Sequence, residues 1–156
     1  MLLHDDLGAP VELLTPVRRV VSLVPSLTEA VAATDRSLLV GATDWCTYPE
    51  DLDVVRVRGT KNPDVRAIAA LAPDLVVANM EENRELDVRR LRDAGVAVWV
   101  TRIEDLGSAF ASMERLVVEA LGLDVPAWLQ EARASWARPA VPLGVRVAVP
   151  VWRDPW

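Results

Sequence analysis

Short apolar runs rich in valine and leucine alternate with helix-like patterns along most of the chain. Each run is almost entirely apolar, which is typical of strands that are buried on both faces of a sheet. Strands separated by helices form parallel sheets with helices on both sides. The sequence therefore predicts an α/β fold, a three-layer αβα, Rossmann-like lobe with a mainly parallel sheet. The predicted extended segments are residues 20–24, 38–41, 54–57, 75–78 and 96–100.

Helices are predicted between and after these strands. Ser26, with Glu29 three residues later, is typical of a capping box that opens a helix reaching about Ala33. Asn62 and Pro63 predict the cap and the first position of a second helix. The remaining helices are predicted from apolar spacing and from the glycines and prolines that bound them. They are about 84–94, closed by Gly95, then 106–120, closed by Gly122, and 126–137.

The last apolar run, residues 144–150, predicts one further strand. A strand needs neighbours, because unpaired backbone groups are costly when buried and pair readily when exposed. We therefore expect an N-terminal lobe over residues 1–138, with a connecting helix at about 126–138. Residues 139–156 are predicted to form a linker and the first strand of an otherwise missing C-terminal lobe, with Trp152 and Trp156 as uncovered cleft residues.

Charge and the scarcity of reactive residues exclude several classes of function. A net charge of −6 disfavours general binding to nucleic acid or to anionic membranes. The single cysteine, Cys46, excludes an internal disulfide. The single histidine, His4, lies near a terminus that we expect to be mobile, and it excludes a multi-histidine metal site. Without a histidine to activate it, Cys46 is expected to be a half-buried loop residue rather than a nucleophile.

The N-terminal residues and the longest apolar runs bear on localisation. The first ten residues lack the basic region and the apolar run of a signal peptide. No stretch has the roughly 20 apolar residues of a transmembrane helix. The sequence as written therefore predicts a cytoplasmic protein, or an extracytoplasmic one if a signal has been removed.

Candidate site residues lie in the loops that follow the predicted strands, where parallel α/β sheets bind ligands. The chain contains no GxGxxG, GxxxxGK[ST] or GxSxG motif, so these loops offer neither a phosphate cradle nor a nucleophile elbow. Trp45 and Tyr48 share one loop. They either pack that loop on the domain or form an aromatic wall for a large planar ligand.

The polar residues of these loops also allow two interpretations each. Lys61 either pairs with an anionic ligand group or is simply solvated. Glu81 and Glu82 are adjacent, so their side chains diverge, and an acid–base dyad is disfavoured. They are either helix N-terminal acids favoured by the helix dipole or cleft residues. Asn79 and Asn83 are likewise either capping residues or ligand contacts.

Four segments, in this order and spacing, resemble a known family. They are VVSLVPSLTE at 20–29, VGATDWCTYP at 40–49, GTKNP at 59–63 and APDLVVA at 72–78. They are similar to segments of class III substrate-binding proteins of ABC transporters. This branch binds cobalamin and ferric siderophores and is also called the helical-backbone metal receptor family. The resemblance runs from about Arg18 to the end of the chain.

The resemblance implies two α/β lobes joined by a long helix, with the ligand in a shallow cleft between them. It implies a non-enzymatic solute-binding protein, or its N-terminal lobe, that binds a metal chelate such as a ferric siderophore or a corrinoid for ABC-transporter-linked uptake. A permease is then a partner, and no cofactor is required. Some aromatic positions that hold the corrin ring in cobalamin binders are replaced, for instance by Thr60. The resemblance places six residues at the cleft edge: Trp45, Tyr48, Thr60, Lys61, Asn79 and Glu82.

Two other hypotheses stay open at the level of sequence. A cytoplasmic α/β enzyme or regulator would use the same strand-end loops, with Glu81, Glu82 and Lys61 as its acid–base set. The apparent lack of a signal favours it, and the shortage of histidine and phosphate-binding loops disfavours it. An interaction module would instead complete the unfinished sheet by self-association, through strand exchange with a second copy of the chain.

Overall fold

A five-stranded parallel sheet forms the centre of the protein. The computed structural model describes residues 1–139 and 144–148. Every strand pair in the sheet is parallel, and the order is β5-β4-β3-β8-β9. The predicted α/β class and parallel sheet are therefore confirmed. The strands are β3 (Val20–Ser22), β4 (Leu39–Ala42), β5 (Val55–Arg56), β8 (Leu75–Asn79) and β9 (Val98–Thr101).

The direction in which strands are added reverses once. From central β3 the chain adds β4 and β5 on one side, then returns to place β8 and β9 on the other. Val21 of β3 therefore lies beside Val76 of β8, although the two are far apart in sequence. A reversal of this kind leaves a crevice between the loops that follow the two central strands. Here those loops follow β3 and β8.

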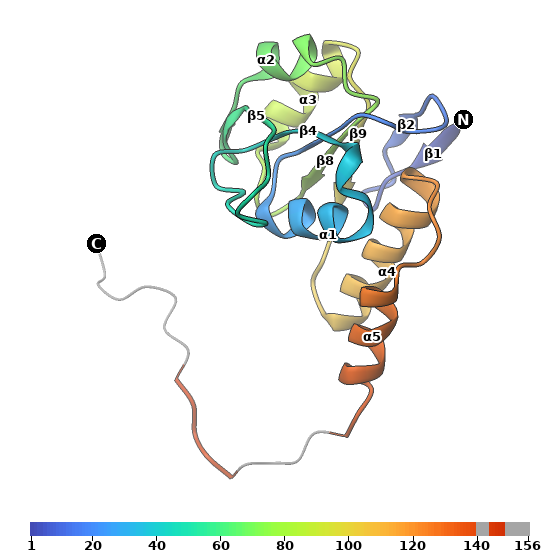
Figure 1. Cartoon of the computed structure of the whole chain (residues 1–156), viewed down its shortest axis with the longest axis vertical. Helices are drawn as coiled ribbons and strands as arrows, with labels where there is room; N and C mark the ends of the chain where they lie inside the picture. The colour runs from blue at the N-terminus through green and yellow to red at the C-terminus, as the bar shows by residue number, and fades with distance from the viewer. Residues whose placement is uncertain (140–143, 149–156) are drawn as a thin grey trace.

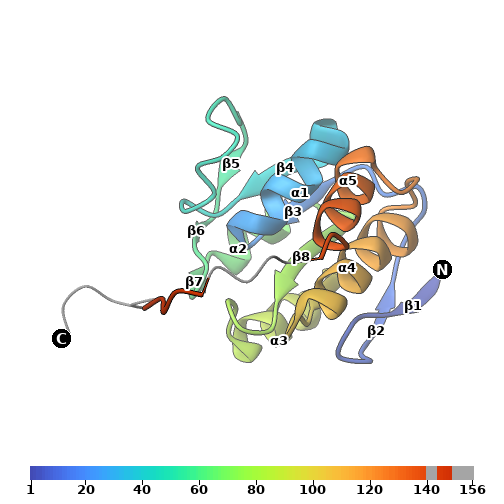
Figure 2. The same ribbon diagram turned by 90° about the horizontal axis from the view of Figure 1, so that it is seen from below.

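Helices cover both faces of the sheet, as predicted. In Figure 1, α2 and α3 lie on one side of the strands and α1 lies on the other. Figure 2 shows α1, α5 and α4 side by side, and the Trp128 Nε1 of α5 donates a hydrogen bond of 3.0 Å to the Thr34 Oγ1 of α1. The helices are α1 (Pro25–Asp35), α2 (Val65–Ala70), α3 (Glu85–Asp93), α4 (Leu106–Arg115) and α5 (Ala127–Trp136).

Two short helical segments extend the longer helices. The 3₁₀ turn η1 (Arg36–Leu38) follows α1, and the π-helical turn η2 (Leu116–Ala120) follows α4. Together α4 and η2 cover the helix predicted over 106–120, whose last part is π-helical. Helix α5 confirms the predicted helix after Pro126, with Leu129 buried inside and Trp136 exposed at the end.

The core lies on both faces of the strands. Residues of β3 and β8 such as Val21 and Val76 have no exposed surface, as expected for strands covered by two helical layers. Ile68 of α2 and Leu91 of α3 are equally buried. The buried Trp99 of β9 lies beneath the Arg115 guanidinium, 5.1 Å from the centre of its ring.

The N-terminus forms a hairpin rather than the mobile segment that we expected. Strands β1 (Leu2–His4) and β2 (Pro10–Glu12) pair antiparallel. The connecting turn docks on the edge strand β9: the Asp6 N–H donates to the Val100 carbonyl at 3.2 Å. Open strand edges invite pairing with other chains, and the hairpin covers part of this one. His4 remains exposed on β1.

Two predicted helix caps are wrong. Helix α1 begins at Pro25, with Val24 as its N-cap, so Ser26 lies inside the first turn and forms no capping box. Asn62 and Pro63 form β7 (Asn62–Pro63), which pairs with β6 (Arg58–Gly59). The N-cap of α2 is instead Asp64, whose Oδ1 accepts a hydrogen bond from the Ala67 N–H at 3.0 Å.

The C-terminal expectations fall largely outside the described residues. Residues 144–148 belong to no strand, whereas residues 149–156, including Trp152 and Trp156, are not described. The first strand of a second lobe therefore stays a prediction, as does the connecting role of α5. Within the described part of the chain, no helix is long and apolar enough to cross a membrane.

Candidate functional site

A cavity of about 620 Å³ opens at the carboxyl ends of the strands. It lies over the point where strand order reverses, because its walls come from the loops after β3 and β8. The loops after β4, β6 and β9 contribute one residue each. Such crevices are where open parallel sheets bind ligands. The lining residues are Val24, Pro25, Ser26, Trp45, Thr60, Asn79, Glu81, Glu82 and Ile103.

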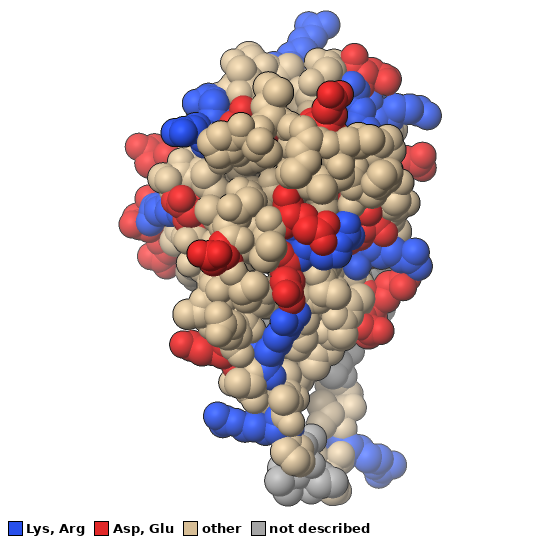
Figure 3. Space-filling view, turned by 90° about the vertical axis from the view of Figure 1, so that its right-hand side faces the viewer, with Lys and Arg blue, Asp and Glu red and all other residues tan. Residues whose placement is uncertain are grey.

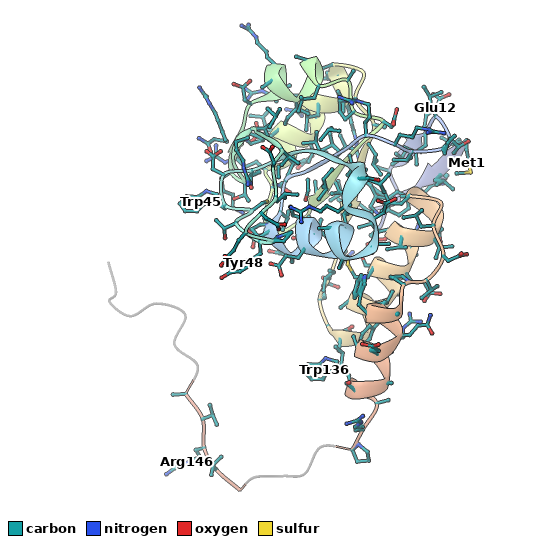
Figure 4. The ribbon with its side chains drawn as sticks, in the orientation of Figure 1. Met1, Glu12, Trp45, Tyr48, Trp136 and Arg146 are labelled. Atoms are coloured by element: carbon teal, nitrogen blue, oxygen red, sulfur yellow. The ribbon has the colours of Figure 1, made fainter. Side chains whose placement is uncertain are left out.

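Four of the six predicted site residues line this cavity, namely Trp45, Thr60, Asn79 and Glu82. Tyr48 and Lys61 do not line it. Figure 4 shows Tyr48 and Trp45 on the same side of the molecule, away from Met1 and Glu12. Glu81, which the sequence left open as a cleft residue, also lines it, whereas Val24, Pro25, Ser26 and Ile103 were not predicted individually. The available signal was their place in the loops after strands, such as Ile103 after β9.

Trp45 is the aromatic wall of the cavity. Its side chain is 67% exposed, although an indole of this size would ordinarily be covered in a folded domain. Gly59 lies beneath it: a Cβ atom there would approach the Trp45 Nε1 to 3.2 Å and the Asn62 Oδ1 to 2.6 Å. The absence of a side chain at Gly59 therefore sets the position of the indole.

The loop that carries Trp45 and Tyr48 is held by two arginines. The Arg56 guanidinium donates to the carbonyl oxygens of Thr43 and Cys46, at 3.1 and 2.8 Å. Arg36 forms a 2.9 Å salt bridge with Asp51, and this hydrogen bond lowers the pKa of that carboxyl. The loop is thus fixed on the domain, and its aromatic residues are presented from a defined backbone.

Cys46 takes part in the packing of this loop and not in the cavity surface. It is fully buried, rather than half-buried as we expected. Its Sγ accepts a hydrogen bond of 3.0 Å from the Thr28 Oγ1 and lies 3.1 Å from the Thr43 Oγ1. The thiol is therefore enclosed by its neighbours, as in a structural cysteine.

Asn83 joins three of the loops around the cavity. Its Oδ1 accepts a hydrogen bond from the Asn79 N–H at 2.9 Å. Its Nδ2 donates to the carbonyl oxygens of Thr60, at 2.9 Å, and Leu23, at 3.4 Å. The side chain is buried, with 6% of its surface exposed. Of the two interpretations left open by the sequence, the structure favours a structural role for Asn83 within the protein.

Asn79 shapes the turn that presents the two glutamates. Its Oδ1 accepts hydrogen bonds from the N–H groups of Glu81 and Glu82, at 2.9 and 3.2 Å. Its Nδ2 donates to the Thr101 Oγ1 at 3.1 Å. Asn79 thus holds the turn after β8 rather than capping a helix, since the N-cap of α3 is Arg84, and both ends of its amide are used inside the protein.

Lys61 does not line the cavity but contacts one of its loops. Its Nζ donates a 2.6 Å hydrogen bond to the Glu81 carbonyl oxygen, which links the β6–β7 turn to the loop after β8. Both glutamates are exposed. Within the described residues, no hydrogen bond or salt bridge engages either carboxylate. The cavity is thus lined by two acidic residues and an indole.

The chemistry that this site offers is recognition. The part of the chain that the structure describes contains no group of three or more His, Cys, Asp or Glu side chains that could hold a metal ion. An indole face, a threonine, backbone N–H groups and two carboxylates can contact a ligand by packing and hydrogen bonding. A ligand containing a metal would accordingly bring the metal's coordinating groups with it.

The relatives found by comparison with known proteins are binding proteins. No protein-family model matches the chain. A substrate-binding lipoprotein of an ABC transporter from Bacillus subtilis, itself uncharacterized, is 32% identical over 64% of this chain and 33% of its own length. A vitamin B12-binding protein from Vibrio cholerae is 29% identical over 65% of this chain and 37% of its own. The chain therefore spans about a third of the length of the curated relatives it matches.

A solved structure of a binding protein shares the fold of this chain. The periplasmic heme-binding protein of Pseudomonas aeruginosa matches 77% of this chain and 43% of its own, with a TM-score of 0.66 and 27% identity. All three are named as binding proteins. The Bacillus protein is named as a lipoprotein and the Pseudomonas protein as periplasmic, so the cytoplasmic expectation gains no support. Over about two thirds of its length, this chain is similar to substrate-binding proteins such as those of ABC transporters.

Proposed function

We propose that this chain is the N-terminal, ligand-binding lobe of a solute-binding protein. It holds a metal chelate, such as a ferric siderophore or a corrinoid, for uptake linked to an ABC transporter. The observation that carries the proposal is the cavity over the strand-order reversal, with Trp45 at its edge. The relatives named for vitamin B12 and for heme support it, because both ligands are large, flat metal chelates.

The proposal assigns a different task to each predicted site residue. Trp45 packs against the flat face of the ligand, and Thr60 and Glu82 contact its polar periphery. Asn79 holds the loop after β8, and Lys61 holds the neighbouring turn. Tyr48, 57% exposed in the same loop as Trp45, contacts the part of a ligand that extends beyond the cavity.

The same relatives support proposals about the location and the partner of this protein. We propose that the chain is not an enzyme, that it works outside the cytoplasmic membrane and that a permease of an ABC transporter is its macromolecular partner. A site without a paired acid and base supports the first statement. The periplasmic and lipoprotein relatives support the other two.

Tryptophan fluorescence tests the binding function directly. The chain is titrated with cobalamin, haem and several ferric siderophores, with correction for inner-filter absorption. We expect one class to give saturable quenching that is largely lost in Trp45→Phe. Trp136→Phe is the matched control, because Trp136 is also 67% exposed but lies at the end of α5. Quenching that Trp136→Phe removes and Trp45→Phe retains would place the ligand elsewhere, and no quenching by any chelate would contradict the proposal.

Self-association through the predicted C-terminal strand is a separate proposal. Val145 and Val147 are 64% and 75% exposed, so a second copy of the chain could bury these apolar side chains by pairing with this segment. Light scattering over a range of protein concentrations tests it. A concentration-dependent dimer that Val145→Lys and Val147→Lys together abolish is the expected result, and a strict monomer at high concentration overturns it.

A further inference from the structure

The charges around the cavity indicate which chelates the cavity accepts. The two acidic lining residues, Glu81 and Glu82, are also the only ionisable ones among the described residues that line it. A carboxylate accepts hydrogen bonds and donates none. The acidic part of the lining therefore suits N–H donors on a ligand and repels carboxylates.

The neighbouring cations do not line the cavity. The Lys61 ammonium donates a hydrogen bond to the Glu81 carbonyl oxygen at 2.6 Å. Arg102, next to the lining residue Ile103, is engaged by Glu104 at 2.8 Å. Arg58, beside the β6–β7 turn, lies 3.8 Å from Asp64. Arg102 and Arg58 thus face carboxylates, whereas Lys61 bonds a neutral carbonyl oxygen and keeps its charge, and none of the three lines the cavity.

The local charge differs from that of other faces of the molecule. Figure 3, which shows the face of the N-terminal hairpin and α4, has acidic and basic side chains interspersed over it. There the acids are paired, as Asp6 is with Arg115 at 2.5 Å and Glu119 with Arg115 at 3.1 Å. The glutamates that line the cavity have no such partner among the described residues, so their charge is not neutralised by an ion pair.

We propose that Glu81 and Glu82 make the cavity selective for chelates with an uncharged or cationic, amide-bearing periphery over chelates with peripheral carboxylates. The inference rests on the proposed function, since it concerns the ligand class of that same cavity. Both glutamates are exposed, so their effect on a ligand in the cavity is screened by salt and is largest at low ionic strength. The corrin amides of a cobalamin-like ligand meet this requirement, whereas the propionates of haem and the carboxylates of an anionic siderophore do not.

Matched ligand pairs test the selectivity on the chain as it exists. Cobinamide and cobyrinic acid share the corrin ring but carry carboxamides and carboxylates, respectively. Haem and haem dimethyl ester differ in the same way. We expect the uncharged member of whichever pair binds to have an affinity about tenfold higher at low salt, and the preference to shrink at high ionic strength.

A charge-removing variant separates local from overall charge. Glu81→Gln with Glu82→Gln should raise the affinity for the carboxylate member about tenfold and abolish most of the preference. Glu12→Gln with Glu131→Gln is the control, because it removes the same charge from exposed positions on β2 and α5. In Figure 4, Glu12 lies on the side of the molecule away from Trp45.

The outcomes distinguish the two levels of the proposal. Binding with equal affinity for both members, or tighter binding of the carboxylate member, overturns the charge selectivity and leaves the binding function intact. A preference that both double variants reduce equally shows an effect of net charge and also overturns it. No saturable binding of any of the four ligands, nor of the ferric siderophores in the fluorescence titration, overturns the proposed function, and the selectivity with it.

Discussion

Asn83 organises the cavity although its side chain faces the protein. One amide group satisfies the Asn79 N–H and two carbonyl oxygens, from Thr60 and Leu23. These partners belong to three different loops, so a single residue sets their relative positions. Buried polar groups that lose a partner cost more than the net value of the hydrogen bond. The residue is therefore sensitive even to an isosteric change.

Asn83→Asp should lower the free energy of unfolding by about 1–3 kcal/mol, because two carbonyl oxygens lose their donor and face a carboxylate. Urea denaturation at neutral pH measures the loss. Asn62→Asp is the control, since it makes the same chemical change at an exposed amide on β7. Equal stability of the two variants would show that the Asn83 hydrogen bonds contribute little.

At the scale of elements, helix caps decide where helices begin. Asp105 caps α4 in a capping box: its Oδ1 accepts from the Ser108 N–H at 2.7 Å, and the Ser108 Oγ accepts from the Asp105 N–H at 2.9 Å. The hydrogen bonds from Ser108 lower the pKa of the Asp105 carboxyl. The carboxylate is thus the form that the helix prefers.

The lowered pKa gives a pH dependence with a defined sign. A carboxyl whose folded-state pKa is depressed stabilises the protein fully above its ordinary value of 3.8, and this contribution is lost as the pH falls through the folded-state pKa. Asp105→Ala should lower the melting temperature by roughly 2–4 °C at pH 7, and by less at pH 3. Asp105→Asn, which keeps a capping oxygen, should be close to the parent at pH 7. A deficit for Asp105→Ala that grows as the pH falls would contradict the assignment.

At the scale of the whole molecule, the N-terminal hairpin ties the edge of the sheet to the helical layers. The buried Asp5 carboxylate pairs with Arg92 of α3 at 2.8 Å and accepts from the Val100 N–H of β9 at 3.4 Å. Asp6 pairs with Arg115 of α4. Two adjacent acids therefore join the first residues to segments about ninety or more positions later.

Asp5→Asn should lower the free energy of unfolding by about 2–4 kcal/mol, because Arg92 loses its ion pair within a largely buried contact. Thermal or urea unfolding measures it, and Asp93→Asn, an exposed acid on α3, serves as the control. Adding Arg92→Met to Asp5→Asn should cost little more than Asp5→Asn alone. Strict additivity of the two changes would show that the pair is not coupled.

The sequence by itself determined the layer order, the main strands and the loops in which the cavity lies. Short valine- and leucine-rich runs bounded by turn residues are typical of strands covered on both faces, and strands such as Val20–Ser22 and Leu75–Asn79 follow that local pattern. The tertiary structure alone decided the contacts that no local pattern encodes. Asp64 rather than Asn62 caps α2 because pairing of β6 with β7 uses Asn62, and Lys61 turns to the Glu81 carbonyl because that loop folds back beside it. Periodicity reports which face of an element is buried, whereas the partner of a polar side chain depends on which distant segment arrives next to it.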